Sequence, residues 1–153
     1  MHKPVTVDME NYARWKSFLV IFCDKYFNAS VVPEDQRPAA FLEKLEKVSM
    51  VKAGKSLIMG VQDCVNFASS WPIENILEAD EYFRQHGAAT LLELFPKFSK
   101  KYSKILNRGK ISSDVEYLFL KGFCEDGAIP ESDLKQVRTL LDAYESSAVK
   151  RHP

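Results

Sequence analysis

The stretch Leu57-Ile-Met-Gly-Val-Gln-Asp-Cys-Val-Asn-Phe-Ala-Ser-Ser-Trp71 decides the fold class of this chain. Its apolar residues recur 0, 4, 7, 8, 11 and 14 positions after the starting leucine, and this spacing places them on one face of an α-helix. The residue before a proline avoids the helical region, so the helix should end near Trp71, just before Pro72. Gly60 costs such a helix about 1 kcal/mol relative to alanine, which indicates close packing of another helix.

Two helices are predicted before this stretch. Asp8 is a suitable N-cap for the first one. Residues at helical spacing form its buried face: Trp15, Leu19, Phe22 and Tyr26. The run Phe18–Cys23 is also compatible with a buried strand, although its flanks keep the helical period. A second helix should run from Ala39 to about Val48, with Pro38 well placed at its first turn. Its inner face should contain Phe41, Leu42, Leu45 and Val48.

Capping motifs mark the later helices. Thr90-Leu-Leu-Glu93 and Ser113-Asp-Val-Glu116 are both capping boxes, in which the first side chain accepts the N3 amide and the glutamate reaches back. Pro96 lies too deep for a first-turn proline, so we expect a kink or a fresh helix start there. The final helix should follow Pro130. Its buried residues should be Leu134, Val137, Leu140, Leu141 and Tyr144.

These patterns predict an all-α fold. The chain of 153 residues has the length of one domain, and no repeat or linker divides it. We therefore expect a single-domain helical bundle of about six to eight helices over residues 1–153, with frayed ends at about 1–7 and 148–153.

Composition places the chain among soluble globular proteins. It is 46% hydrophobic, and its 21 basic residues balance 21 acidic ones. The three cysteines, Cys23, Cys64 and Cys124, have apolar neighbours and no CxxC spacing, so we expect three buried, reduced thiols in a cytoplasmic protein. No apolar run approaches the length of a membrane span, and the N-terminus has no secretory signal pattern.

No pattern in the sequence is typical of an enzyme. Gly54-Lys-Ser56 lacks the upstream glycine of a phosphate-binding loop, because Ser49 stands at that position. His86 precedes Gly87 at a predicted helix end. There the helix dipole stabilises a positively charged imidazolium, which can also reach a free carbonyl. We expect no catalytic residue, metal site or cofactor, although two carboxylates brought together by the fold would be invisible in the sequence.

Charge is distributed in blocks. Residues 72–95 carry a net −4, residues 96–113 a net +6, and residues 114–145 a net −5. In the first block Glu74, Glu78 and Glu81 share one helical stripe, with Asp80 nearby, and we predict that these four residues bind a partner. The alternative is a solvated helix face.

The basic block lies within Pro96–Lys110 and contains Lys97, Lys100, Lys101, Lys104, Arg108 and Lys110. If this block is one helix, Lys97, Lys101, Lys104 and Arg108 fall on a single stripe. The neighbouring aromatic residues should point into the core and so be unable to stack on bases. The stripe is therefore either a solvated face or an anion-binding surface.

The segment from Gly87 to Gly127 carries a resemblance to known proteins. It contains Thr90-Leu-Leu-Glu-Leu, Phe98-Ser-Lys-Lys-Tyr, Asn107-Arg-Gly-Lys-Ile and Asp114-Val-Glu-Tyr. This pattern resembles small helical bacterial proteins, among them the immunity proteins of contact-dependent growth inhibition. The resemblance implies a small, non-enzymatic cytoplasmic protein without a cofactor, which blocks a toxin domain by tight binding. It implies no role for any single residue.

The hypothesis favoured by the sequence is therefore an interaction protein of the immunity type. Its partner would be a toxin domain, and it would bind neither a membrane nor a cofactor. The alternative is a nucleic-acid-binding or regulatory helical domain that uses residues 97–110. An enzyme is the third choice.

Overall fold

The computed structural model describes residues 7–151 of the chain. Within that range the chain forms eight α-helices and two short 3-10 helices, and it contains no strand. The α-helices are α1 (Met9–Tyr26), α2 (Pro38–Val48), α3 (Met50–Ala68), α4 (Ile73–Gln85), α5 (Leu91–Phe98), α6 (Lys100–Arg108), α7 (Asp114–Glu125) and α8 (Glu131–Arg151). The short ones are η1 (Ala29–Val31) and η2 (Glu34–Gln36). The all-α prediction is confirmed, and the alternative of a strand at Phe18–Cys23 is wrong.

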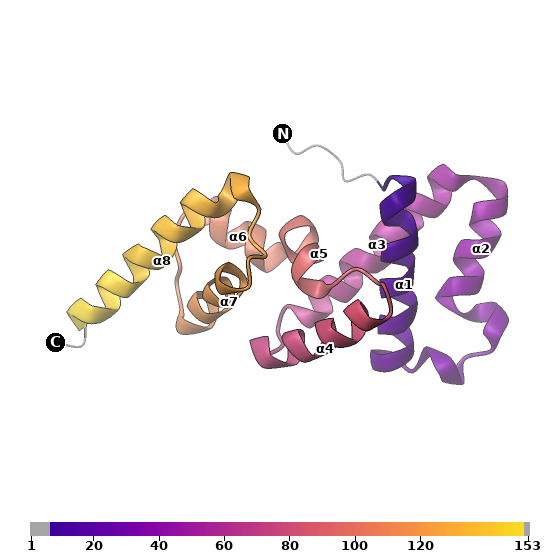
Figure 1. Cartoon of the computed structure of the whole chain (residues 1–153), viewed down its shortest axis with the longest axis horizontal. Coiled ribbons are helices and arrows are strands. Elements are labelled where there is room, and N and C mark those ends of the chain that lie inside the picture. The colour runs from indigo at the N-terminus through magenta and orange to yellow at the C-terminus, as the bar shows by residue number, and fades with distance from the viewer. Residues whose placement is uncertain (1–6, 152–153) are drawn as a thin grey trace.

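The helices form an elongated bundle. Helices α1, α2 and α3 lie at one end, α6, α7 and α8 lie at the other, and α4 and α5 lie between them (Figure 1). Helix α3 packs against α1, α2 and α5, while α4 packs against α5 and α7. The buried apolar side chains of both ends belong to one continuous core, as expected of a single domain.

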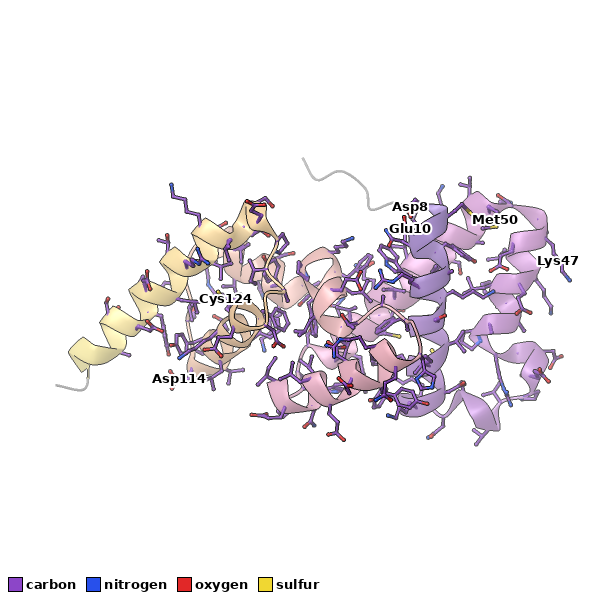
Figure 2. The ribbon with its side chains drawn as sticks, viewed as in Figure 1. Asp8, Glu10, Lys47, Met50, Asp114 and Cys124 are labelled. Carbon is purple, nitrogen blue, oxygen red and sulfur yellow. The ribbon has the colours of Figure 1, made fainter. Side chains whose placement is uncertain are left out.

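The predicted caps explain where three helices begin. Asp8 lies at the start of α1 and accepts the backbone N–H of Asn11 at 2.8 Å (Figure 2). Thr90 and Glu93 form the complete capping box of α5. Ser113 accepts the N–H of Glu116 at 3.2 Å, but the Glu116 carboxylate accepts instead from the backbone N–H of Ser112 at 2.8 Å. The second capping box is therefore only half formed.

The predicted inner face of α2 is wrong in part. Leu42 is buried and Leu45 partly buried, but Phe41 is 55% exposed and Val48 is 76% exposed. Leu42 lies on the side of α2 that faces α1, where Glu46 also accepts hydrogen bonds from Tyr12 and Lys16. Phe41 and Val48 consequently lie on the opposite edge of the buried face.

Close packing at Gly60 is confirmed. A Cβ atom at this position would lie 3.0 Å from the Cδ2 atom of Leu19 on α1. The missing side chain therefore lets α1 approach α3 closely.

The chain starts a new helix at Ser99, three residues after Pro96. Pro96 lies inside α5. Ser99 has extended backbone angles, is fully buried, and accepts the N–H of Tyr102 at 3.2 Å. The break therefore divides the basic block of residues between α5 and α6.

The predicted frayed ends are only partly described. Residues 1–6 and 152–153 lie outside the described residues. Helix α8 continues to Arg151 and so extends into the segment 148–153 that we predicted to fray.

Candidate functional site

The exposed face of α4 carries three of the four predicted partner-binding acids. Glu74, Glu78 and Glu81 are exposed, and Leu77 and Tyr82, each 38% exposed, lie at the two edges of the same face. These five residues occupy roughly 140° of the helix circumference at about 100° per residue. We call them the α4 surface. Glu81 also pairs with Arg84 across 2.9 Å, an exposed i,i+3 contact that contributes little stability.

Asp80 does not belong to the α4 surface. Its side chain is fully buried, and its carboxylate accepts the N–H of Leu91 at 2.6 Å and the N–H of Leu92 at 3.1 Å. It lies about 100° around the helix from Glu81, on the side that packs against the start of α5. Asp80 is therefore a structural residue that satisfies the free amides of α5, and its prediction as a partner-binding residue is wrong.

Burial also governs the ionisation of Asp80. Burial raises the pKa of Asp80 to about 6, although the N–H groups of Leu92 and Leu91 and the nearby Arg84 favour the carboxylate. Asp80 should therefore take up a proton at a higher pH than an exposed aspartate does.

An aromatic cavity of about 550 Å³ adjoins the α4 surface at Glu78. Its walls include Tyr26 from α1, Phe67 from α3, and Trp71 from the turn between α3 and α4. Phe67 is 49% exposed. This cavity was not among the sites predicted from the sequence. The available signal was Phe67, an aromatic residue 10 positions after Leu57 and therefore off the buried face of its helix.

The predicted basic stripe is not one surface. Lys97 belongs to α5, whereas Lys101, Lys104 and Arg108 belong to α6. The extended backbone at Ser99 separates the two helices, so the spacing of a continuous helix does not apply across it.

Two cations of the predicted stripe are held by the protein itself. Lys101 donates to the carbonyl oxygen of Ser69 at 3.3 Å, its ammonium lies 4.7 Å from the Phe119 ring centroid, and burial lowers its pKa. The Arg108 guanidinium pairs with Glu116 and donates from Nε to the carbonyl of Lys110 at 2.9 Å. The exposed Lys110 itself borders a different cavity, formed with α8.

The remaining three lysines do come together. Lys97, Lys100 and Lys104 border a cavity of about 610 Å³ in which Ser103 and Asn107 supply further polar groups. We call this the basic cavity. Lys97 also lies 5.3 Å from the ring centroid of Trp15. The basic cavity has the charge to receive an anion, but it contains only half of the six predicted anion-binding residues.

The cysteines differ in burial. Cys23 and Cys64 are buried and hydrogen-bonded to each other, and this bond lowers the pKa of Cys23. The same bond, together with burial, raises the pKa of Cys64. Cys124 is half-buried. All three are free thiols, so burial is confirmed for two of them and is incomplete for the third.

His86 fulfils the predicted capping role. Its Nδ1 atom lies 2.9 Å from the carbonyl oxygen of Tyr82, and the two rings stack with centroids 4.2 Å apart. Gly87 follows with a φ of 68°, in the left-handed region that ends many helices.

Within residues 7–151, no three histidine, cysteine, aspartate or glutamate side chains are grouped closely enough to hold a metal ion. None of the helices in the described part of the chain is long and apolar enough to cross a lipid bilayer.

Comparisons with family models, with curated proteins and with solved structures found no match for this chain. The functional argument therefore depends on the α4 surface, the aromatic cavity and the basic cavity themselves.

Proposed function

We propose that this chain is a non-enzymatic interaction protein that uses the α4 surface to bind a basic surface of a protein partner. The observation that carries the proposal is the composition of α4. One face presents three exposed carboxylates bordered by Leu77 on one side and Tyr82 on the other, while Asp80 on the opposite side anchors the helix to α5. A row of charges of one sign with apolar groups at its edges is suited to recognition of an oppositely charged surface.

The partner in this proposal is a toxin domain, and the chain is its cytoplasmic immunity protein in a bacterium. The support comes from the resemblance of residues 87–127 to contact-dependent growth inhibition immunity proteins. A nuclease toxin must carry a positive substrate site to hold phosphates. A carboxylate row that covers this site would both accelerate association and exclude the nucleic acid.

The test is protection of growing cells against the toxin domain encoded directly upstream of this chain's gene. The wild-type chain should restore growth, and Glu74/Glu78/Glu81→Lys should not. The matched control is Lys97/Lys100/Lys104→Glu, which reverses the same number of exposed charges elsewhere and should still protect. Thermal melting of all three proteins should coincide. Equal protection by the acid-reversed variant, or an upstream region without a toxin gene, would refute the proposal.

The basic cavity supports a second candidate, binding of nucleic acid. Its observation is the convergence of Lys97, Lys100 and Lys104 on one cavity. Fluorescence anisotropy with a labelled single-stranded oligonucleotide tests it. Binding should weaken with salt by roughly one power per phosphate contact and be lost in Lys97/Lys100/Lys104→Glu. An affinity that does not depend on salt concentration, or that is unchanged in this variant, would exclude the basic cavity as a nucleic-acid site.

A further inference from the structure

The aromatic cavity beside Glu78 has walls set at steep angles. The ring centroids of Tyr26 and Trp71 lie 4.8 Å apart with an interplanar angle of 59°. Those of Phe67 and Trp71 lie 6.1 Å apart at 83°. Three rings that meet in this way form a corner, which can contact a small group from more than one side.

The position of Trp71 is fixed by the core. Its ring stacks on Phe22 with centroids 5.7 Å apart and planes only 6° from parallel, and Phe22 is fully buried. Trp71 therefore needs no reordering to receive a ligand. Preorganised aromatic walls lower the entropic cost of binding.

Glu78 gives the cavity a negative charge at its edge. It lines the cavity and is exposed. Among the residues that the structure describes, Glu78 has no cationic partner within salt-bridge distance. The charge of Glu78 acts on the aromatic wall. The pKa of Tyr26 is raised first by the burial of its own side chain and then by the nearby negative charge of Glu78. A cationic group at this edge would gain a charge partner in Glu78.

Lys25 places a cation beside one ring of the cavity, Tyr26, and closer to Tyr82 outside it. Its ammonium lies 4.0 Å from the ring centroid of Tyr82 and 6.0 Å from that of Tyr26. The faces of aromatic rings attract cations through the ring quadrupole. Lys25 also borders the cavity, so its charge should oppose, rather than assist, a second cation.

We infer that the aromatic cavity receives a cationic side chain, arginine or lysine, from the protein partner that contacts the α4 surface. The inference rests on the proposed function, since the partner is the one proposed above. The alkyl part of that side chain would contact Phe67 and Trp71, and its charge would pair with Glu78. A central aromatic pocket with an adjacent charge partner is a common location for the residues that dominate an interface.

The experiment uses two blocked tripeptides, acetyl-Gly-Arg-Gly-amide and its citrulline analogue, which has nearly the same shape and no charge. The Trp71 indole N–H resonance is followed by NMR, with the buried Trp15 indole, 1% exposed, as the internal reference. The arginine peptide should shift the Trp71 signal saturably at roughly millimolar concentration. The citrulline peptide should bind about 3–5-fold more weakly.

Four variants separate the contributions. Glu78→Gln should reduce binding of the arginine peptide to the level of citrulline, and Phe67→Leu should weaken both peptides. Lys25→Gln should tighten binding of the arginine peptide. Glu43→Gln, a change at an exposed acid on α2, is the matched control and should change nothing. Equal binding of the two peptides, or unchanged binding in Glu78→Gln, would overturn the inference.

Failure of the cavity inference can be distinguished from failure of the proposed function. If the toxin domain is neutralised and Glu78→Gln and Phe67→Leu protect as well as wild type, the interaction proposal stands and the cavity inference is overturned. If the arginine peptide binds as described while no protection is observed, the cavity's preference for a cation is supported and the toxin assignment fails.

Discussion

The carboxylate of Asp80 on α4 accepts the backbone N–H of Leu91, the first residue of α5, at 2.6 Å. The second carboxylate oxygen accepts from Leu92 at 3.1 Å. One side chain therefore joins two helices that are separated by a short turn, and it does so from within an acidic segment whose other members face solvent. Replacing the buried acid of α4 should therefore lower the stability of the protein, whereas replacing an exposed acid of α4 should not.

Asp80→Ala should reduce the free energy of unfolding by about 2–4 kcal/mol, because it leaves two buried amides without an acceptor. The matched control is Glu78→Ala on the same helix, where an exposed side chain is lost and the change should stay within about 0.5 kcal/mol. Urea denaturation followed by circular dichroism measures both. Similar midpoints for the two variants would mean that water replaces the Asp80 carboxylate.

The pKa of Asp80 also predicts how stability depends on pH. A folded-state pKa of about 6, above the ordinary value of 3.8, means that the folded protein holds this proton more tightly than the unfolded chain. The stabilisation from protonation is complete below about pH 4 and is lost as the pH rises through about 6. The stability of wild type relative to Asp80→Asn should therefore fall by about 2–3 kcal/mol between pH 4 and pH 7.

The comparison with Asp80→Asn removes the contributions of the other carboxylates, since both proteins contain them. Arg84 and Asp126, which also influence Asp80, remain in both. A difference between the two proteins that stays constant, or that grows as the pH rises, would contradict the raised pKa.

Ser113→Ala should cost about 1 kcal/mol, the usual effect of removing an N-cap. The Ser113 side chain accepts the Glu116 N–H at the start of α7. Ser112→Ala is the matched control, because the Ser112 contact to Glu116 uses the backbone N–H and survives the change. Thermal melting of the two variants distinguishes these expectations. A larger loss of stability in Ser112→Ala would mean that Ser112, and not Ser113, is the N-cap of α7.

The three thiols should react in a defined order. With a thiol-specific chromogenic reagent, the half-buried Cys124 should react first, while the buried pair of Cys23 and Cys64 should react only as fast as the protein opens. Cys124→Ala should abolish the first phase and leave the slow phase unchanged. A fast phase of two equivalents in this variant would show that the pair is accessible in the folded protein.

The sequence determined those features that depend on residues close together along the chain. Asp8, Thr90 and Ser113 each accept an N–H from three residues ahead, as their spacing requires. The period of Leu57, Val61 and Val65 predicts a helix because successive turns stack the same side chains on one face.

The tertiary structure decided which side of each helix is used, and for what. Asp80 and Glu81 are neighbours in sequence, but only packing of α5 onto α4 separates a buried cap from an exposed acid. The predicted lysine stripe is wrong because Ser99, buried against Ser69 at the C-terminal end of α3, starts a new helix where the spacing assumes a continuous one. The aromatic cavity joins Phe67 and Trp71, four residues apart, with Tyr26 from α1, and this pairing depends on the packing of α1 against α3.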